Sequence, residues 1–193
     1  MRLILGSKSP RRREILNYFS LSFEQISPNF DEEAVPYNGD PSFYVQFLAA
    51  GKALSLSREY PEGTILSADT IVYKEGKPYG KPKSEVEAFL FLQELQGSWH
   101  SVYSGVALWQ EDKLFKGYEE TKVLFNPLTS LQIKHYLKAL HWADKAGGYA
   151  IQLSGGLIAQ KIEGCYYNVI GLPINSVNKL FNKVGIDLWN HLN

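Results

Sequence analysis

Apolar and polar positions alternate in blocks along the chain, and the blocks predict a succession of short buried strands. Such strands are predicted over residues 3–5, 22–26, 65–73, 102–109 and 114–125. The last two flank a polar turn at residues 110–113, which indicates a β-hairpin. Residues 166–170 are predicted to form a last strand near the end of the chain.

Helical spacing of apolar side chains predicts helices between these strands. The first begins at Pro10 with Ser9 as its N-cap, because proline is tolerated at the first helical position. Others are predicted over residues 41–57, 84–95 and 129–140, with capping-box pairs Ser84–Glu87 and Thr129–Gln132, and a final one spans Val177 to Val184. The alternation predicts an α/β fold, a mixed twisted sheet flanked by helices, in two lobes with a central cleft.

Size and composition exclude several classes of protein. The 193 residues, 45% of them hydrophobic, fit a single domain over residues 1–193 that is built of two lobes. Cys165 has no second cysteine to pair with, which fits a reducing, cytoplasmic location. There is no apolar run of membrane-spanning length, so no membrane segment is expected. The net charge of zero argues against long nucleic acid as a partner.

The charges are nevertheless unevenly placed at the start of the chain. Arg2, Lys8, Arg11, Arg12 and Arg13 precede the first acidic residue, Glu14. The predicted strand, turn and helix start would present free backbone N–H groups, together with the hydroxyl of Ser7, to an anion. Basic side chains at a helix start oppose the helix dipole, and a bound anion would relieve that conflict. We therefore favour a phosphate site here over a solvated basic turn.

Other charges lie in positions that allow two interpretations each. Asp69, in the middle of an apolar strand, is either half of a buried salt bridge or a metal ligand or general base. Lys52, on the apolar face of a predicted helix, either pairs with an anion or extends its ammonium group to water. Residues 31–33 are three carboxylates that suit Mg²⁺ or Mn²⁺, although a solvated acidic loop explains an isolated triplet better.

With these features in place, the chain resembles the Maf proteins, also called septum formation inhibitor-like proteins, over nearly its whole length. The resemblance is carried by Gly6-Ser7-x-Ser9-Pro10-Arg11-Arg12, Asp31-Glu32, Lys52-Ala53, Ala68-Asp69-Thr70-Ile71-Val72, Gly80-Lys81-Pro82, Leu95-Gln96-Gly97-x-x-His100-x-Val102, Lys145-Ala146-Gly147-Gly148-Tyr149-Ala150-Ile151-Gln152 and Tyr167-x-Val169-x-Gly171-Leu172-Pro173. Gly51, before Lys52, departs from the family pattern, and a glycine inside a helix costs about 1 kcal/mol relative to alanine.

The resemblance implies a nucleoside triphosphate pyrophosphatase that releases a monophosphate and pyrophosphate with a divalent cation, on a fold similar to house-cleaning nucleotide pyrophosphatases. It implies Asp69 as general base and metal-site residue and Glu32 as a second metal-site carboxylate. It assigns Ser7, Arg12, Lys52 and Lys81 to the triphosphate. The chain is similar to the subgroup that acts on dTTP and UTP at three positions, Arg11, Thr70 and Gln152.

Two other functions would also fit parts of this sequence. A non-enzymatic nucleotide-binding regulator of cell division would keep the phosphate site, but it would not need the carboxylates of Asp69 and Glu32. An RNA-binding protein would need an extended basic face, which the net charge disfavours. Similar proteins are commonly homodimers, although no feature of this sequence demonstrates one.

Overall fold

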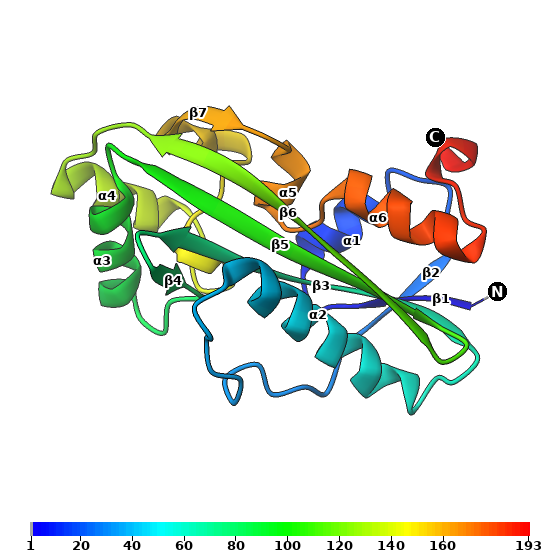
Figure 1. Cartoon of the computed structure of the whole chain (residues 1–193). Coiled ribbons are helices and arrows are strands. Elements are labelled where there is room, and N and C mark those ends of the chain that lie inside the picture. Colours follow the sequence, from blue (N-terminus) through cyan, green and yellow to red (C-terminus); the bar gives the residue numbers. More distant parts are fainter. Residues whose placement is uncertain (1) are drawn as a thin grey trace.

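One mixed sheet runs the length of the molecule in a computed structural model that describes residues 2–193 (Figure 1). Its strands are β1 (Arg2–Gly6), β2 (Phe23–Ile26), β3 (Gly63–Lys74), β4 (Lys77–Tyr79), β5 (Trp99–Gln110), β6 (Lys113–Phe125) and β7 (Ala159–Glu163). They are ordered β2-β1-β3-β5-β6-β7, and β4 pairs with the end of β3. β1 is parallel to β2 and β3, whereas the other pairs are antiparallel. The predicted mixed sheet is confirmed.

Six α-helices surround the sheet in the described part of the chain. They are α1 (Pro10–Leu16), α2 (Pro41–Ser57), α3 (Glu85–Leu95), α4 (Ser130–Ala139), α5 (Tyr166–Ile170) and α6 (Ile174–Phe181), with 3-10 turns at Ala146–Gly148, Leu153–Ile158, Asn182–Val184 and Leu188–His191. None of the described helices is both long and apolar enough to cross a membrane.

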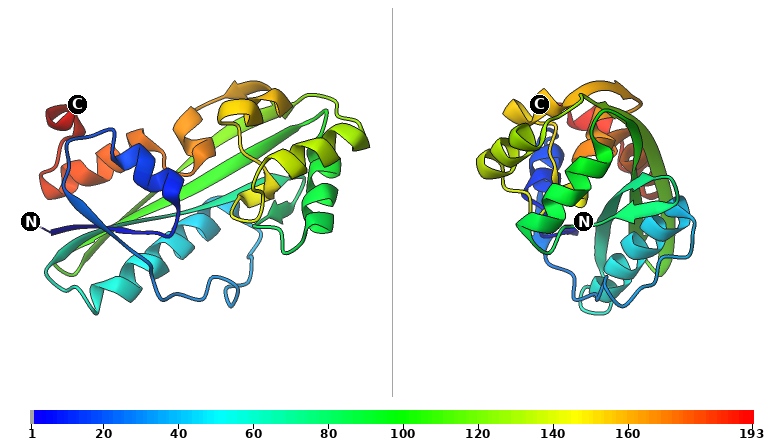
Figure 2. Two further views of the ribbon diagram at one scale, coloured as in Figure 1. Left: turned by 180° about the vertical axis from the view of Figure 1, so that it is seen from behind. Right: turned by 90° about the vertical axis from the view of Figure 1, so that its left-hand side faces the viewer.

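The two faces of the sheet are covered by different helices, as Figure 2 shows. Successive side chains of a strand point to opposite faces. Ile4 and Ile65 accordingly share a core with α2, whereas the next residues, Leu5 and Leu66, share a core with α1 and α6. A third core lies at the other end of the sheet, against α3 and α4. The layered arrangement places α1 and α2 on opposite sides of β3.

Three local predictions need correction. Residues 166–170 form helix α5 and not a strand, because the buried amide of Asn168 donates to Val102 O and Thr121 Oγ1, and Gly171 ends the helix in the left-handed conformation. The Ser84 capping box is half formed, since Glu87 accepts from the backbone N–H of Lys83. The last helix ends at Phe181, and a 3-10 turn follows it.

Gly105 sets how closely α2 approaches the sheet. A Cβ atom at this position would lie 2.4 Å from the backbone carbonyl of Val45 in α2. Gly105→Ala is therefore expected to lower the free energy of unfolding by about 1–3 kcal/mol, because the helix backbone must shift. Gly117→Ala is the matched control, since its Cβ would meet just one side chain, at 3.8 Å. Equal denaturation midpoints for the two variants would contradict this account.

His100 gives the fold a pH dependence. Its Nε2 lies 2.8 Å from the hydroxyl of Tyr149, and burial lowers the pKa of His100 to about 3. In the unfolded chain the pKa is about 6.5, so below that pH the unfolded state gains a proton that the native state does not. Stability is therefore full above pH 6.5 and falls as the pH decreases, by about 2 kcal/mol at pH 5 from this group.

Denaturant unfolding at pH 7 and pH 5 measures this loss. His100→Gln keeps a polar partner for Tyr149 but does not titrate, so its stability should fall by about 2 kcal/mol less than that of the wild type over the same interval. Most carboxylates remain ionised down to pH 5, which isolates the contribution of His100. An unchanged difference between the two pH values in His100→Gln would refute the assignment.

Candidate active site

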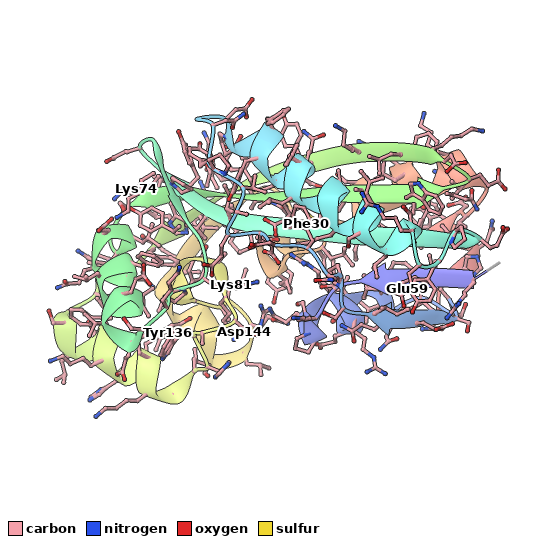
Figure 3. The ribbon with its side chains drawn as sticks, turned by 90° about the horizontal axis from the view of Figure 1, so that it is seen from below. Phe30, Glu59, Lys74, Lys81, Tyr136 and Asp144 are labelled. Carbon is pink, nitrogen blue, oxygen red and sulfur yellow. The ribbon has the colours of Figure 1, made fainter. Side chains whose placement is uncertain are left out.

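A gap in the sheet lies on one side of β3. β1 pairs with β3 up to the Gly6–Ser67 pair, and β4 begins to pair at Val72. Between these points, residues 68–71 have no strand partner on that side within the described chain. A cleft of about 740 Å³ opens at the gap. The residues that line this cleft include Phe30, Lys81 and Asp144, which are labelled in Figure 3.

Asp69 and Thr70 point to opposite faces of the sheet at this gap. Asp69 points toward α2, where its Oδ1 accepts a hydrogen bond from Lys52. Thr70 points toward α1, where its hydroxyl accepts from Arg12 and lies 2.8 Å from the hydroxyl of Ser104. Both residues line the cleft. The strand therefore supplies a carboxylate on one side and a hydroxyl on the other.

Lys52 joins two carboxylates that are distant in sequence. Its Nζ lies 2.5 Å from Asp69 Oδ1 and 3.1 Å from Glu32 Oε1. The side chains of Lys52 and Asp69 are 5% and 8% exposed, so the pair is buried. Of the two interpretations that the sequence left open for each residue, Lys52 pairs with anions, and Asp69 forms a buried salt bridge. That salt bridge does not exclude a role for Asp69 in chemistry.

Glu32 lies beside two lysines. Its Oε2 is 3.9 Å from Nζ of Lys81, in addition to the contact with Lys52. Burial alone would raise the pKa of Glu32, but the positive charges of Lys52 and Lys81 outweigh it and hold that pKa below its usual value. Glu32 is therefore an anion in the cleft at neutral pH.

The acidic triplet separates into three different roles. Asp31 accepts backbone N–H groups from Glu33 and Ala34, so it shapes the turn. Glu33 points outward and pairs with exposed Lys83. Of the three carboxylates, Glu32 is thus the one that reaches Lys52.

Gly51 helps to hold this acidic loop against α2. A Cβ atom on Gly51 would lie 2.4 Å from the ring of Phe30, two residues before Glu32. The ring can rest on the helix because no side chain is present there. The glycine that departs from the family pattern therefore has a packing role, which offsets its unfavourable helix propensity.

Arg12 binds four acceptors of the chain itself. Its guanidinium donates to the backbone carbonyls of Gly171 and Ala68 and to the hydroxyls of Thr70 and Ser7. Burial lowers the pKa of Arg12, opposed by the charges of Asp69 and Glu32. Four of its five N–H groups are thereby engaged. The predicted contact between Arg12 and phosphate stays a prediction. The hydrogen bonds give Arg12 a second role, because they attach the first turn of helix α1 to β3.

The turn after β1 is held in place by neighbouring polar groups. Ser7 Oγ accepts the backbone N–H of Ser9, and the side-chain amide of Gln25 donates to the carbonyls of both serines. Ser7 is buried at the wall of the cleft. α1 is a helix of just seven residues, so its dipole is small and an anion here would depend mainly on side chains and turn N–H groups.

Sequence reasoning missed Asp144, which pairs with Arg11. Arg11 Nη1 lies 2.6 Å from Asp144 Oδ2, and Lys145 Nζ lies 2.6 Å from Asp144 Oδ1. Asp144 directly precedes the motif that begins at Lys145, so the family pattern could have drawn attention to it. No local spacing predicts its partner, because 133 positions separate Arg11 from Asp144.

The structure brings the sequence-predicted site residues together. Ser7, Arg11, Arg12, Glu32, Lys52, Asp69, Thr70, Lys81 and Gln152 all line the same cleft. Lys81 is the most exposed of the charged residues in this predicted set, with a side chain 60% exposed. Gln152 precedes the 3-10 turn Leu153–Ile158. The individual roles of these residues stay predictions.

Two carboxylates of the cleft lie close enough together to bind one divalent cation. Among the described residues, no group of three or more His, Cys, Asp or Glu side chains is arranged to hold a metal. Mg²⁺, however, is commonly held by one or two carboxylates, with substrate phosphates and waters as further ligands. Glu32 and Asp69, both within 3.1 Å of Lys52 Nζ, fit that smaller donor set.

Comparison with known sequences gives matches along nearly the whole chain. The family described as "Maf-like protein" matches residues 2–184. The dTTP/UTP pyrophosphatase of Chlamydia caviae is 49% identical, over 98% of this chain and 97% of that protein. Proteins of the same name from Clostridium perfringens and Chlamydia trachomatis are 42% and 40% identical, with 97% and 99% of this chain and 100% and 98% of theirs covered.

Solved structures give weaker matches. A nucleoside-triphosphatase/dITP/XTP pyrophosphatase from Mycobacterium abscessus is 11% identical, over 95% of both chains, with a TM-score of 0.46. The Ham1 protein of Staphylococcus aureus is 14% identical over 64% of this chain and 72% of its own, with a TM-score of 0.42. Scores this low carry no conclusion about the site.

Proposed function

This chain belongs to the Maf-like protein family, and from that premise we propose that it hydrolyses nucleoside triphosphates to the monophosphate and pyrophosphate. The observation that supports this most is the pair of carboxylates held by Lys52 at the gap beside β3, opposite the basic turn after β1. Anionic and cationic groups thus face one cleft, as a metal-bound polyphosphate requires.

Each side of the cleft has its own task in this proposal. Mg²⁺ or Mn²⁺ bound by Glu32 and Asp69 would neutralise charge on the triphosphate oxygens. Lys52 donates to Asp69 Oδ1 and orients that carboxylate, which accepts a proton from the attacking water. Lys81 and Arg12 stabilise negative charge on the phosphates, with Ser7 as a further donor.

The proposed substrates are pyrimidine nucleotides, dTTP and UTP. This is supported by the names of relatives that are 40–49% identical over almost the full chain, which are called dTTP/UTP pyrophosphatases. It is also supported by Arg11, Thr70 and Gln152, which share the cleft with the carboxylates. We further propose a single domain, supported by the continuous sheet, with two lobes, supported by the separate hydrophobic cores at the two ends of that sheet. We also propose a cytoplasmic location, supported by the single cysteine.

Release of pyrophosphate by the purified chain tests the proposed function. The protein is incubated with Mg²⁺ or Mn²⁺ and separately with dTTP, UTP, CTP, GTP and ATP, and pyrophosphate and orthophosphate are measured apart. Pyrophosphate released fastest from dTTP and UTP is the expected result. Orthophosphate as the first product would refute cleavage between the α and β phosphates. Tight binding without turnover would support the nucleotide-binding regulator instead.

A further inference from the structure

Arg11 makes two hydrogen bonds to Asp144. Its Nη1 donates to the carboxylate of Asp144 at 2.6 Å, and its Nη2 donates to the backbone carbonyl of the same residue at 3.0 Å. Two bonds from one guanidinium to one residue fix the plane of the group as well as its distance. Arg11 is therefore held in one orientation, whereas a single ion pair would leave it free to swing.

The two partners come from opposite walls of the cleft. Arg11 is in α1, directly after the turn that follows β1. Asp144 lies in the loop between α4 and the 3-10 turn Ala146–Gly148, and it lines the cleft together with Lys81; both are labelled in Figure 3. That loop is anchored to the Lys81 side, because Gly147 donates to the carbonyl of Gly80 and has space for no side chain beside Val72. The pair thus bridges the cleft.

Asp144 also neutralises a second cation. Its Oδ1 accepts from Lys145, whose side chain is 13% exposed, while the Arg11 side chain is 20% exposed. Burial alone would raise the pKa of Asp144, but Lys145 and Arg11 keep that pKa below its usual value. Without the carboxylate, two partly buried positive charges would face each other, and Arg11 would turn away from Lys145.

We propose that Asp144 is the positioning residue that holds Arg11 across the cleft and thereby sets the preference for pyrimidine over purine nucleoside triphosphates. The inference rests on the proposed function. A fixed guanidinium presents its remaining N–H groups to the cleft in one direction, which suits the carbonyl oxygens of a one-ring base. The bridge also keeps the walls together, and a two-ring base needs more room than a one-ring base.

Asp144→Asn tests this positioning by steady-state kinetics on dTTP and dGTP. The KM for dTTP should rise about tenfold, the effect of losing one charge-assisted hydrogen bond, while kcat changes less than about threefold. The ratio of kcat/KM for dTTP to that for dGTP should fall by a similar factor. Glu24→Gln, which breaks the exposed pair between Arg2 and Glu24, is the matched control and should leave that ratio unchanged.

A double variant separates positioning from a purely structural role. If Asp144 acts through Arg11, Arg11→Gln combined with Asp144→Asn should lose no more selectivity than either single variant. Losses that multiply would overturn the proposal, as would an unchanged dTTP to dGTP ratio in Asp144→Asn. Thermal unfolding of each variant is recorded, and Asp144→Ser replaces Asp144→Asn if the latter does not fold.

Equilibrium binding distinguishes failure of this inference from failure of the proposed function. Calorimetric titration with dTTP and dGTP needs no turnover. If the wild type releases no pyrophosphate but prefers dTTP, and Asp144→Asn loses that preference, the proposed function fails and the positioning role stands. Equal affinities of the wild type for dTTP and dGTP, or no binding of either, would overturn the positioning role.

Discussion

Replacing Asp69 with asparagine is expected to reduce pyrophosphate release by about 100-fold or more, the usual contribution of a general base. The amide keeps the size of the side chain and an oxygen that can accept from Lys52, which donates to Oδ1 at 2.5 Å in the wild type. It cannot take a proton from water, and it is a poor ligand for a divalent cation. The kcat for pyrophosphate release should therefore fall, while the affinity for the nucleotide changes less.

The fold of Asp69→Asn should remain intact. Lys52 retains Glu32 as an anionic partner at 3.1 Å, so its ammonium group is not left alone in the interior. Thermal unfolding and pyrophosphate release are measured on the same preparation. Turnover close to that of the wild type would remove Asp69 from the chemistry, and loss of activity together with loss of folded protein would show a structural role instead.

Lys52→Met should destabilise the protein more than any other single change at the site. The substitution leaves the carboxylate of Asp69, which is 8% exposed, without its buried partner. Breaking a buried ion pair in this way costs about 3–5 kcal/mol, and the partial exposure of Glu32 places the expected value at the lower end. Denaturant unfolding without added metal measures the loss.

Mg²⁺ provides a second measurement on the same variant. Two carboxylates without their lysine should bind a divalent cation in its place, so Mg²⁺ should raise the melting temperature of Lys52→Met more than that of the wild type.

Lys83→Met, which breaks an exposed pair with Glu33, is the control for the loss of stability. It should lower the free energy of unfolding by less than about 1 kcal/mol. Equal losses in the two lysine variants would show that the Lys52 pair contributes no special stability.

Much of the fold could be predicted from local pattern. Helix α2 occupies residues 41–57 as expected, and its start is fixed by Asp40, whose side chain caps Ser42 and Phe43. The hairpin of β5 and β6 also follows from two apolar runs around a polar turn. In both cases the signal lies in residues that are close together in the sequence, so local pattern is sufficient to predict the structure.

Other features depend on contacts that local pattern does not contain. The segment at residues 166–170 is a helix because Asn168 bonds across to β5 and β6, and tertiary contacts of this kind override local propensity. The pairing of Arg11 with Asp144 likewise joins residues 133 positions apart. Gly51 could be recognised as unusual, but the ring that requires it, that of Phe30, could not be identified from sequence.

Asp69 and Thr70 point to opposite faces of the sheet, so the site forms only if β3 pairs in the correct register. Each is placed by the register of β3, in which Asp69 lies opposite Gly105 and Thr70 opposite Ser104. A slip of one residue would turn each side chain to the other face of the sheet, so that Asp69 left the side of Lys52 and Thr70 left the side of Arg12. Deleting one residue early in β3 would therefore harm the site more than most substitutions, although every side chain of the cleft would still be encoded.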